Sequence, residues 1–205
     1  MKGIGPTPLI GETADALHSH GCLWLEEAIR ELVFSRLAHI ILGSSAGTVH
    51  AVVDTGIDAT VSGVRRRRAL LVRDVSLRAA HLQRALLYSP TTLFHVHDVE
   101  RVTAARRCAL ECTATKDITE FCRRLARRAG RTVARCHSRM FFQGGLTSGN
   151  LDVDGSLIDF GGARFVPTFQ PLTYETRGQF FGQELASAYK PVSYTHLTLP
   201  TNREV

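Results

Sequence analysis

The residues of this 205-residue chain that are best suited to chemistry lie in the segment QGGLTSGNLDVDGSLIDFGGA, at positions 143–163. It reads as a Gly-rich loop, a strand from Asn150 to Val153, a tight Asp154-Gly155 turn and a second strand that ends at Ile158. Because a hairpin holds its two ends together, we expect Asn150 and Asp159 to lie side by side. An amide oxygen and a carboxylate that converge in this way form a hard-oxygen site suited to Mg²⁺. The alternative is an ordinary hairpin with solvated polar ends.

A long helix is predicted immediately before this segment, over Ile118–Phe142. Its apolar residues repeat at helical spacing: Ile118, Phe121, Cys122, Leu125, Ala129, Val133, Cys136 and Met140. Arginines form a stripe on the opposite side: Arg123, Arg124, Arg127, Arg128, Arg131 and Arg135. We expect this stripe to be a solvated face.

Further elements are predicted toward the N-terminus, after a loop-rich entry over residues 1–22. Residues Trp24–Leu42 form an amphipathic helix with an apolar face made of Ile29, Leu32, Val33, Leu37, Ile40 and Ile41. Thr48–Asp54 and Ala69–Val75 read as strands joined by Gly-containing linkers, and Asp98–Cys112 reads as a helix. The mixture predicts an α+β fold.

The composition excludes several classes of protein. With 44% hydrophobic and 21% charged residues, the chain resembles neither a disordered protein nor a coiled coil. Its apolar runs are far shorter than the ~18 residues of a membrane span, and no signal peptide is evident, so we expect a cytoplasmic protein without membrane partners. The net charge of +6 is carried by arginine, because three of the 25 basic residues are lysines. No aromatic residues interleave with the arginines, which makes nucleic acid an unlikely partner.

The cysteines and histidines give no metal or disulfide pattern. The five cysteines (Cys22, Cys108, Cys112, Cys122 and Cys136) are odd in number and contain no C-x-x-C pair, so we expect buried free thiols. Cys108 and Cys112 have the spacing of helix neighbours. The H-x-H pairs at 18–20 and 95–97 have no evident third ligand.

Four stretches, in order, resemble the SelO (YdiU) family of kinase-like protein adenylyltransferases. MKGIGPTP at the start resembles L-K-G-x-G-x-T-P, and EAIREL at 27–32 resembles s-I-R-E-f-l. ALLVRDVSLR at 69–78 resembles V-L-x-R-V-A-x-S-x-x-R, with a spacing two residues shorter. QGGLTSGNLDVDGSLIDFGG resembles H-G-V-M-N-T-D-N-M…I-D-Y-G-P and keeps the nine-residue step from Asn to Asp.

This resemblance implies a protein-kinase-like fold of the SelO pseudokinase type, and ATP and Mg²⁺ as cofactors. It implies transfer of AMP from ATP to a Ser, Thr or Tyr hydroxyl of a protein substrate. Nucleotide phosphates would be bound by Lys2, Arg73 and Arg78, with Glu31 holding Lys2 in place. The metal would be held by Asn150 and Asp159, as the catalytic-loop Asn and the D-F-G Asp do in kinases.

The chain departs from the family where catalysis is concerned. Gly149 occupies the position of the Asp that acts as base, and Gln143 replaces a His, so no catalytic residue is assigned and activity is expected to be impaired. Asp152 and Asp154 are predicted to be a strand-exposed carboxylate and a turn residue. Two alternatives therefore stay open: a non-catalytic pseudokinase that acts as an interaction or maturation module, and a small-molecule phosphotransferase of the aminoglycoside-kinase type, suggested by G-N-L-D-V-D-G…I-D-F-G.

We expect residues 1–190 to be part of a kinase-like nucleotide-binding domain that is incomplete at both ends. PVSYTHLTLPT, at 191–201, is the translation of a transposase-derived sequencing adaptor, so residues 191–205 are interpreted as an artefact tail. The family's Gly-rich segment, which precedes the lysine, is missing. Without preceding strands, Lys2 is expected to lack a sheet partner, and ATP binding is expected to be weak.

Overall fold

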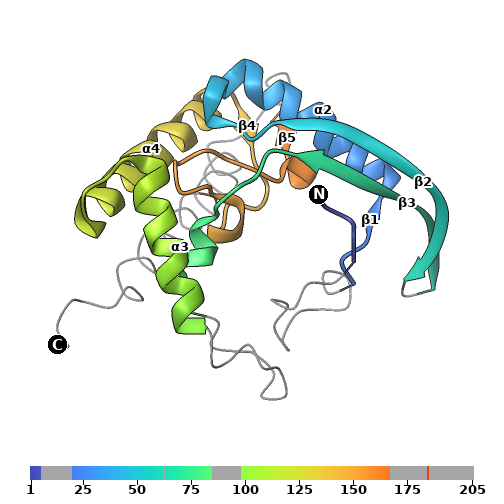
Figure 1. The fold of residues 1–205 in the computed structure, drawn as a ribbon. Helices are drawn as coiled ribbons and strands as arrows, with labels where there is room; N and C mark the ends of the chain where they lie inside the picture. Colours follow the sequence, from blue (N-terminus) through green and yellow to red (C-terminus); the bar gives the residue numbers. More distant parts are fainter. Residues whose placement is uncertain (6–19, 62, 85–97, 167–183, 185–205) are drawn as a thin grey trace.

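A computed structural model describes residues 1–5, 20–61, 63–84, 98–166 and 184. They form a mixed α+β structure, as the sequence predicts (Figure 1). The predicted tail at 191–205, the histidines of the 95–97 pair and most of the predicted entry loop lie outside the described residues. No helix within the described ranges has the length and apolar character needed to cross a bilayer.

A long antiparallel hairpin dominates the N-terminal part of the chain. Strand β2 (Val49–Val61) pairs with β3 (Val64–Arg73), and β1 (Leu23–Trp24) pairs with the other edge of β3. The strands are longer than predicted, because Arg65–Arg68 continue β3 as strand residues. Arg65, Arg66 and Arg67 pair with the end of β2, and Arg68 pairs with Trp24 of β1. The runs of β-branched and aliphatic residues predicted the two strands. They did not predict that the far end of the hairpin, where most residues are exposed, also forms strand.

Helix α2 (Leu25–Leu42) lies along one face of this hairpin (Figure 1). The predicted apolar face is correct only in part. Leu32 and Ile41 are partly buried and pack against the cores, whereas Ile29 and Val33 are about half exposed and Ile40 is 80% exposed. The residues that α2 buries also recur at helical spacing, and all but the last are small or polar: Ala28, Glu31, Ser35, Ala38 and Leu42. Small side chains let the helix approach the strands closely. Ser35 also forms hydrogen bonds at the start of β2, because its hydroxyl donates to the Gly47 carbonyl and accepts from the Val49 amide.

Helix α4 (Ile118–Ser138) is amphipathic in the predicted sense, and its buried stripe runs from Phe121 to Cys136. Asp117 caps its N-terminus by accepting a hydrogen bond from the Glu120 amide at 2.8 Å. The helix ends before the predicted Phe142, because the chain turns through Met140 at φ +55° into the short strand β4 (Phe141–Phe142). The stripe arginines Arg123, Arg127, Arg128, Arg131 and Arg135 are exposed, and Arg124 is partly exposed.

Helix α3 (Asp98–Thr113) matches its predicted range to within one residue. Its Arg101 donates to the carbonyls of His81 and Gln83, which joins α3 to the 3₁₀ turn η2 (Ala79–Leu82). The expectation of buried thiols holds for Cys122 and Cys136 and is wrong for Cys108 and Cys112, which lie on the exposed face of α3. That face has the polar composition of a surface helix, and helical spacing alone does not say which side a cysteine occupies.

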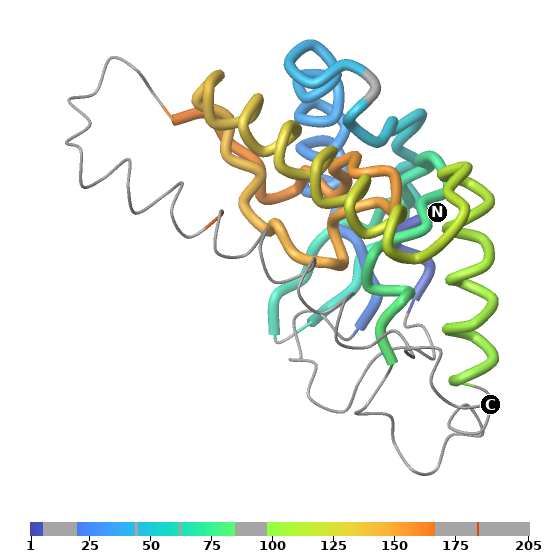
Figure 2. The backbone as a smooth tube through the Cα atoms, turned by 90° about the vertical axis from the view of Figure 1, so that its left-hand side faces the viewer, coloured from blue at the N-terminus to red at the C-terminus, as the bar shows by residue number. Residues whose placement is uncertain are grey.

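The chain after α4 folds back along that helix (Figure 2). It contains two 3₁₀ turns, η4 (Ser148–Asn150) and η5 (Phe160–Gly162), and strand β5 (Arg164–Phe165), which pairs with β4. Phe141, Leu151, Leu157 and Phe160 join the buried stripe of α4 in the main core. A second, smaller core lies between α2 and the sheet, so α2 stands between the two halves of the structure.

Candidate functional site

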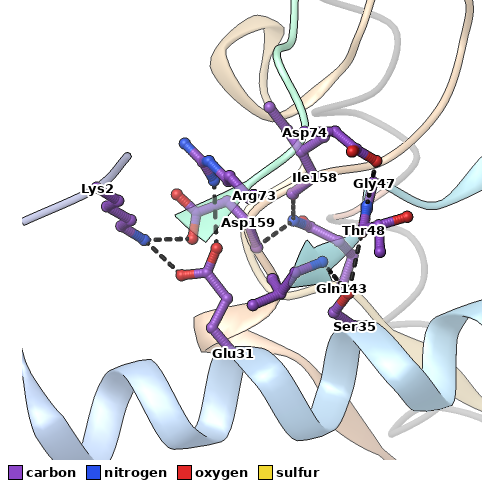
Figure 3. A network of polar contacts seen from close by, with 11 residues as sticks. Lys2, Glu31, Ser35, Gly47, Thr48, Arg73, Asp74, Gln143, Ile158 and Asp159 are labelled. Atoms are coloured by element: carbon purple, nitrogen blue, oxygen red, sulfur yellow. Dashed lines mark hydrogen bonds and ion pairs between the residues drawn. The ribbon is translucent and has the colours of Figure 1, made fainter. Parts of the chain in front are cut away.

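Three ionisable side chains that are remote in sequence meet at one point (Figure 3). The Lys2 Nζ lies 2.7 Å from Oε2 of Glu31 and 2.8 Å from Oδ1 of Asp159. Glu31 is 1% exposed, while the Lys2 and Asp159 side chains are 30% and 26% exposed. A buried carboxylate thus orients an ammonium group that still reaches solvent.

A second cation reaches the same carboxylate. The Arg73 guanidinium, at the end of β3, lies 3.2 Å from the other Glu31 oxygen, Oε1 (Figure 3). Arg78 is within electrostatic reach: burial lowers its pKa and the Arg73 charge lowers it further, while the carboxylates of Asp159, Glu31 and Asp152 act in the opposite direction. The structure therefore gathers every residue for which the resemblance implies a phosphate-binding role.

The charges of Lys2 and Asp159 stabilise each other. Burial lowers the pKa of Lys2, but the carboxylates of Asp159 and Glu31 outweigh it and hold that pKa above its ordinary value. Burial raises the pKa of Asp159, but Lys2, Arg73 and Arg78 outweigh it and hold that pKa below its ordinary range. The raised pKa of Lys2 and the lowered pKa of Asp159 keep both of these side chains charged near neutral pH.

Lys2 does have a sheet partner, contrary to the prediction. Its amide donates to the Leu71 carbonyl at 2.9 Å, and its carbonyl accepts from the Leu71 amide at 3.0 Å. This single bridge lies next to β1, on the same edge of β3. The backbone of Lys2 is consequently fixed by strand pairing, and its side chain by two ion pairs.

The predicted hairpin at 150–158 is present as a tight turn with isolated bridges rather than as two strands. Leu151 pairs with Leu157, and the Ile158 amide donates to the Asn150 carbonyl at 3.1 Å. The turn packs directly on α4: Gly155 has φ +86°, and a Cβ there would lie 2.5 Å from the Cβ of Arg128. The turn can pack this closely against α4 only with glycine at position 155, and this contact fixes the distance between the turn and the helix.

Asn150 and Asp159 line one cavity of about 740 Å³ together with Lys2. Glycines form part of its wall: Gly144, Gly145, Gly161 and Gly162. At Gly144 the two glycine segments touch, because a Cβ there would lie 2.3 Å from the Gly162 carbonyl oxygen. Backbone without side chains leaves room for a ligand beside the charged cluster.

The donor set in this cavity fits Mg²⁺. The Asn150 amide nitrogen donates to the Gly145 carbonyl at 2.7 Å, which leaves its oxygen as the group available to a metal. Asp159 uses Oδ1 for Lys2, and no hydrogen bond to its Oδ2 occurs among the described residues. One amide oxygen and one carboxylate oxygen suit a cation that keeps several waters or phosphate oxygens.

Asp159 itself has an uncommon backbone conformation, with φ +61° and ψ +74°. Left-handed conformations are rare for residues other than glycine and are found at sites whose surroundings enforce them. Here Gln143 provides that enforcement. Its buried amide nitrogen donates to the carbonyls of Ile158 and Asp159 at 3.0 and 2.9 Å, and its oxygen accepts from the Gly145 amide at 2.8 Å.

The position of Gln143 was visible in the sequence as a departure from a family motif, yet its supporting role was not predicted. The same holds for Glu184, a buried carboxylate that accepts from the amides of Gln143 and Gly144 at 2.7 and 3.0 Å. Its other oxygen lies 2.9 Å from Nε2 of His137. A lone glutamate 41 residues downstream carries no motif, so no sequence signal identified it.

Asp152 is not the strand-exposed carboxylate that was predicted. It is partly buried, it accepts a hydrogen bond from the Ser76 hydroxyl at 2.6 Å, and burial raises its pKa. It lines a second cavity of about 220 Å³ to which Glu31, Arg73 and Asp159 also belong. Asp154 is the predicted turn residue, and its carboxylate accepts from the Ser156 amide. The cluster of Lys2, Glu31 and Asp159 therefore stands between two cavities.

Gly149, at the expected base position, brings no functional group to either cavity. The atom nearest to a Cβ built there is the Thr147 hydroxyl oxygen, at 3.5 Å. No protein-family model matches the chain, and no curated protein matches it. What the arrangement offers chemically is a set of cations for phosphate groups, two oxygens for a divalent cation and no carboxylate at the expected base position.

Proposed function

We propose that this chain is a divergent relative of the SelO family with a kinase-like fold. Its proposed activity is the ATP- and Mg²⁺-dependent transfer of AMP to a hydroxyl group of a protein substrate. The observation that supports this most strongly is the ion pair between Lys2 and Glu31 beside Asp159. In kinase-like enzymes a Lys–Glu pair and a metal-binding Asp must both be in place for phosphoryl chemistry.

Each residue of the cluster has a proposed role. Lys2, Arg73 and Arg78 would neutralise the phosphates, and Glu31 would keep the first two oriented through its two oxygens. Asn150 and Asp159 would hold Mg²⁺, which would supply charge neutralisation at the reacting phosphate. Gln143 would act as a positioning residue, since it holds the backbone of Asp159.

In the proposed reaction, the acceptor hydroxyl oxygen forms a bond to the α-phosphorus of ATP. The bond from that phosphorus to the bridging oxygen breaks, pyrophosphate leaves, and the hydroxyl proton passes to water. With Gly149 at the base position, the rate is expected to be lower by the 10²–10⁴-fold that a general base typically contributes. The same glycine favours a second candidate, a pseudokinase that binds nucleotide without transferring a group.

The test is incubation of the chain with Mg²⁺ and a protein acceptor, using ATP labelled on the α- or the γ-phosphate. Label transferred from the α-position supports adenylylation. Label from the γ-position would overturn it in favour of a phosphotransferase, and no label with retained ATP binding would favour the pseudokinase.

Asp159→Ala is the diagnostic variant, because it removes a proposed metal ligand. We expect it to abolish label transfer, whereas Asp58→Asn, a control on the hairpin arm that pairs with Arg65, should leave transfer unchanged. Transfer that survives in Asp159→Ala would refute the metal assignment.

A further inference from the structure

Two thiols that play no part in the proposed function lie together on the surface of α3. Cys108 and Cys112 are both exposed, are one helical turn apart and have their Sγ atoms 3.7 Å apart. In the thiol form, one sulfur shares a proton with the other. This hydrogen bond is the largest cause of the raised pKa of Cys112, and it favours the thiol form of that residue.

The geometry disfavours a disulfide between these residues. In an undistorted helix, Cβ atoms four residues apart are separated by about 5–6 Å. A disulfide needs a Cβ separation of about 3.5–4.5 Å and an S–S bond of about 2.05 Å. The helix would therefore have to deform before the bond could close.

The same geometry suits two sulfurs bound to one metal ion. Zinc–thiolate bonds are about 2.3 Å long, so two sulfurs on a tetrahedral zinc ion lie about 3.8 Å apart. The observed 3.7 Å separation thus matches the edge of the coordination tetrahedron without any change in the helix. A C-x₃-C pair on a helix thus reaches the sulfur spacing that C-x-x-C turns provide in zinc sites.

We propose that Cys108 and Cys112 form a two-thiolate site for a thiophilic divalent ion of the zinc class. Binding would release one proton from each thiol as the two sulfur–metal bonds form, with no change of oxidation state. Among the residues that the structure describes, no cluster of three or more His, Cys, Asp or Glu side chains is arranged to hold a metal. With the two sulfurs as the ligands from the described residues, further coordination positions stay open to water or to another ligand.

This inference is independent of the candidate nucleotide site. The two thiols lie in the last two turns of α3, which ends at Thr113. An ion that bridges residues one turn apart would clamp this end of the helix. We therefore expect the thermal midpoint of the reduced protein to rise when Zn²⁺ is added.

The experiment titrates the fully reduced chain with Cd²⁺, and then with Zn²⁺ in competition, under anaerobic conditions. Cadmium–thiolate charge-transfer absorbance in the ultraviolet reports the ligands directly. We expect an absorbance change that saturates, is reversed by Zn²⁺, and is lost in both Cys108→Ser and Cys112→Ser. Cys22→Ser is the matched control, since Cys22 is also a free cysteine with partial exposure and is not part of the Cys108–Cys112 contact, and this variant should bind as the parent chain does.

Circular dichroism of each variant establishes that the helix content is unchanged, so that a lost signal means a lost ligand. Full binding in either serine variant at positions 108 and 112, or the absence of any cadmium signal in the parent chain, would overturn the proposal. Formation of an intramolecular disulfide between the two thiols on exposure to oxidised glutathione would overturn the geometric argument against oxidation.

Discussion

The ion pair between Lys2 and Glu31 allows a quantitative test by a double-mutant cycle with Lys2→Met and Glu31→Gln. Glu31 is buried and accepts from two cations, at 2.7 and 3.2 Å. A hydrogen bond to a charged group typically contributes about 1.5–3 kcal/mol. Because the Lys2 side chain is 30% exposed, solvent screening reduces that contribution.

In each single variant, the remaining charged residue keeps a second ion-pair partner, which reduces the loss of stability. Without Lys2, Glu31 keeps its pair with Arg73, and without the Glu31 charge, Lys2 keeps Asp159. We therefore expect each variant to lower the free energy of unfolding by about 1–2 kcal/mol. The coupling energy between the two sites should be about 1 kcal/mol.

The assay is equilibrium unfolding in urea for the parent chain, both single variants and the double variant. A control cycle uses Arg65→Met and Asp58→Asn, a pair at 3.0 Å whose arginine is 76% exposed, for which we expect a coupling below about 0.5 kcal/mol. If the Lys2–Glu31 coupling were no larger than that of this surface pair, the argument that a buried carboxylate fixes Lys2 would be refuted.

Three further outcomes are expected in the same unfolding assay. The stability difference between the parent chain and Lys2→Met should be constant from about pH 5 to about pH 10. It should shrink in acid as pH falls through the lowered pKa of Asp159, and in alkali as pH rises through the raised pKa of Lys2. Gly155→Ala should cost at least ~2 kcal/mol, because φ is +86° and the new Cβ would clash with α4, whereas Gly130→Ala, at an open position in α4, should raise stability by up to ~1 kcal/mol. Ile40→Gln should change the free energy of unfolding by less than ~0.5 kcal/mol, because Ile40 is exposed. A large loss of stability would show that Ile40 is buried, as the sequence predicted.

The sequence predicted α4 well and the packing of α2 poorly, for one physical reason. In α4 the buried positions are large and apolar, so the 3.6-residue period and the buried stripe coincide. In α2 close approach to the strands selects Ala28 and Ser35, and the site selects Glu31, while Ala38 packs in the main core and Ile40 faces solvent. A hydrophobicity pattern cannot show burial that depends on small size or on an ion pair.

The charged residues of the candidate site were predicted from the sequence, but the residues that hold its backbone in place were not. Lys2, Glu31 and Asp159 came from a resemblance between motifs, and the structure brings them within ion-pair distance. Gln143 and the carboxylate of Glu184 were missed, because their hydrogen bonds go to backbone groups and leave no pattern of residue types. Asp152 was misjudged because its burial depends on the contact with Ser76, which is 76 residues away in the chain.

The separations along the chain within the cluster bear on the order in which the protein folds. Lys2 and Asp159 are 157 residues apart, whereas α4 and the β2–β3 hairpin form from neighbouring residues. Contacts between distant residues are the slowest to form, so the Lys2–Asp159 ion pair should close late, after the Lys2–Glu31 pair, whose residues are 29 positions apart. During synthesis at 5–20 residues per second, Lys2 waits roughly 8–30 s before Asp159 is made. Formation of the Lys2–Asp159 contact therefore reports that the N-terminal strand and the chain after α4 have come together, and a probe placed at this pair would distinguish molecules that have made this contact from those that have not.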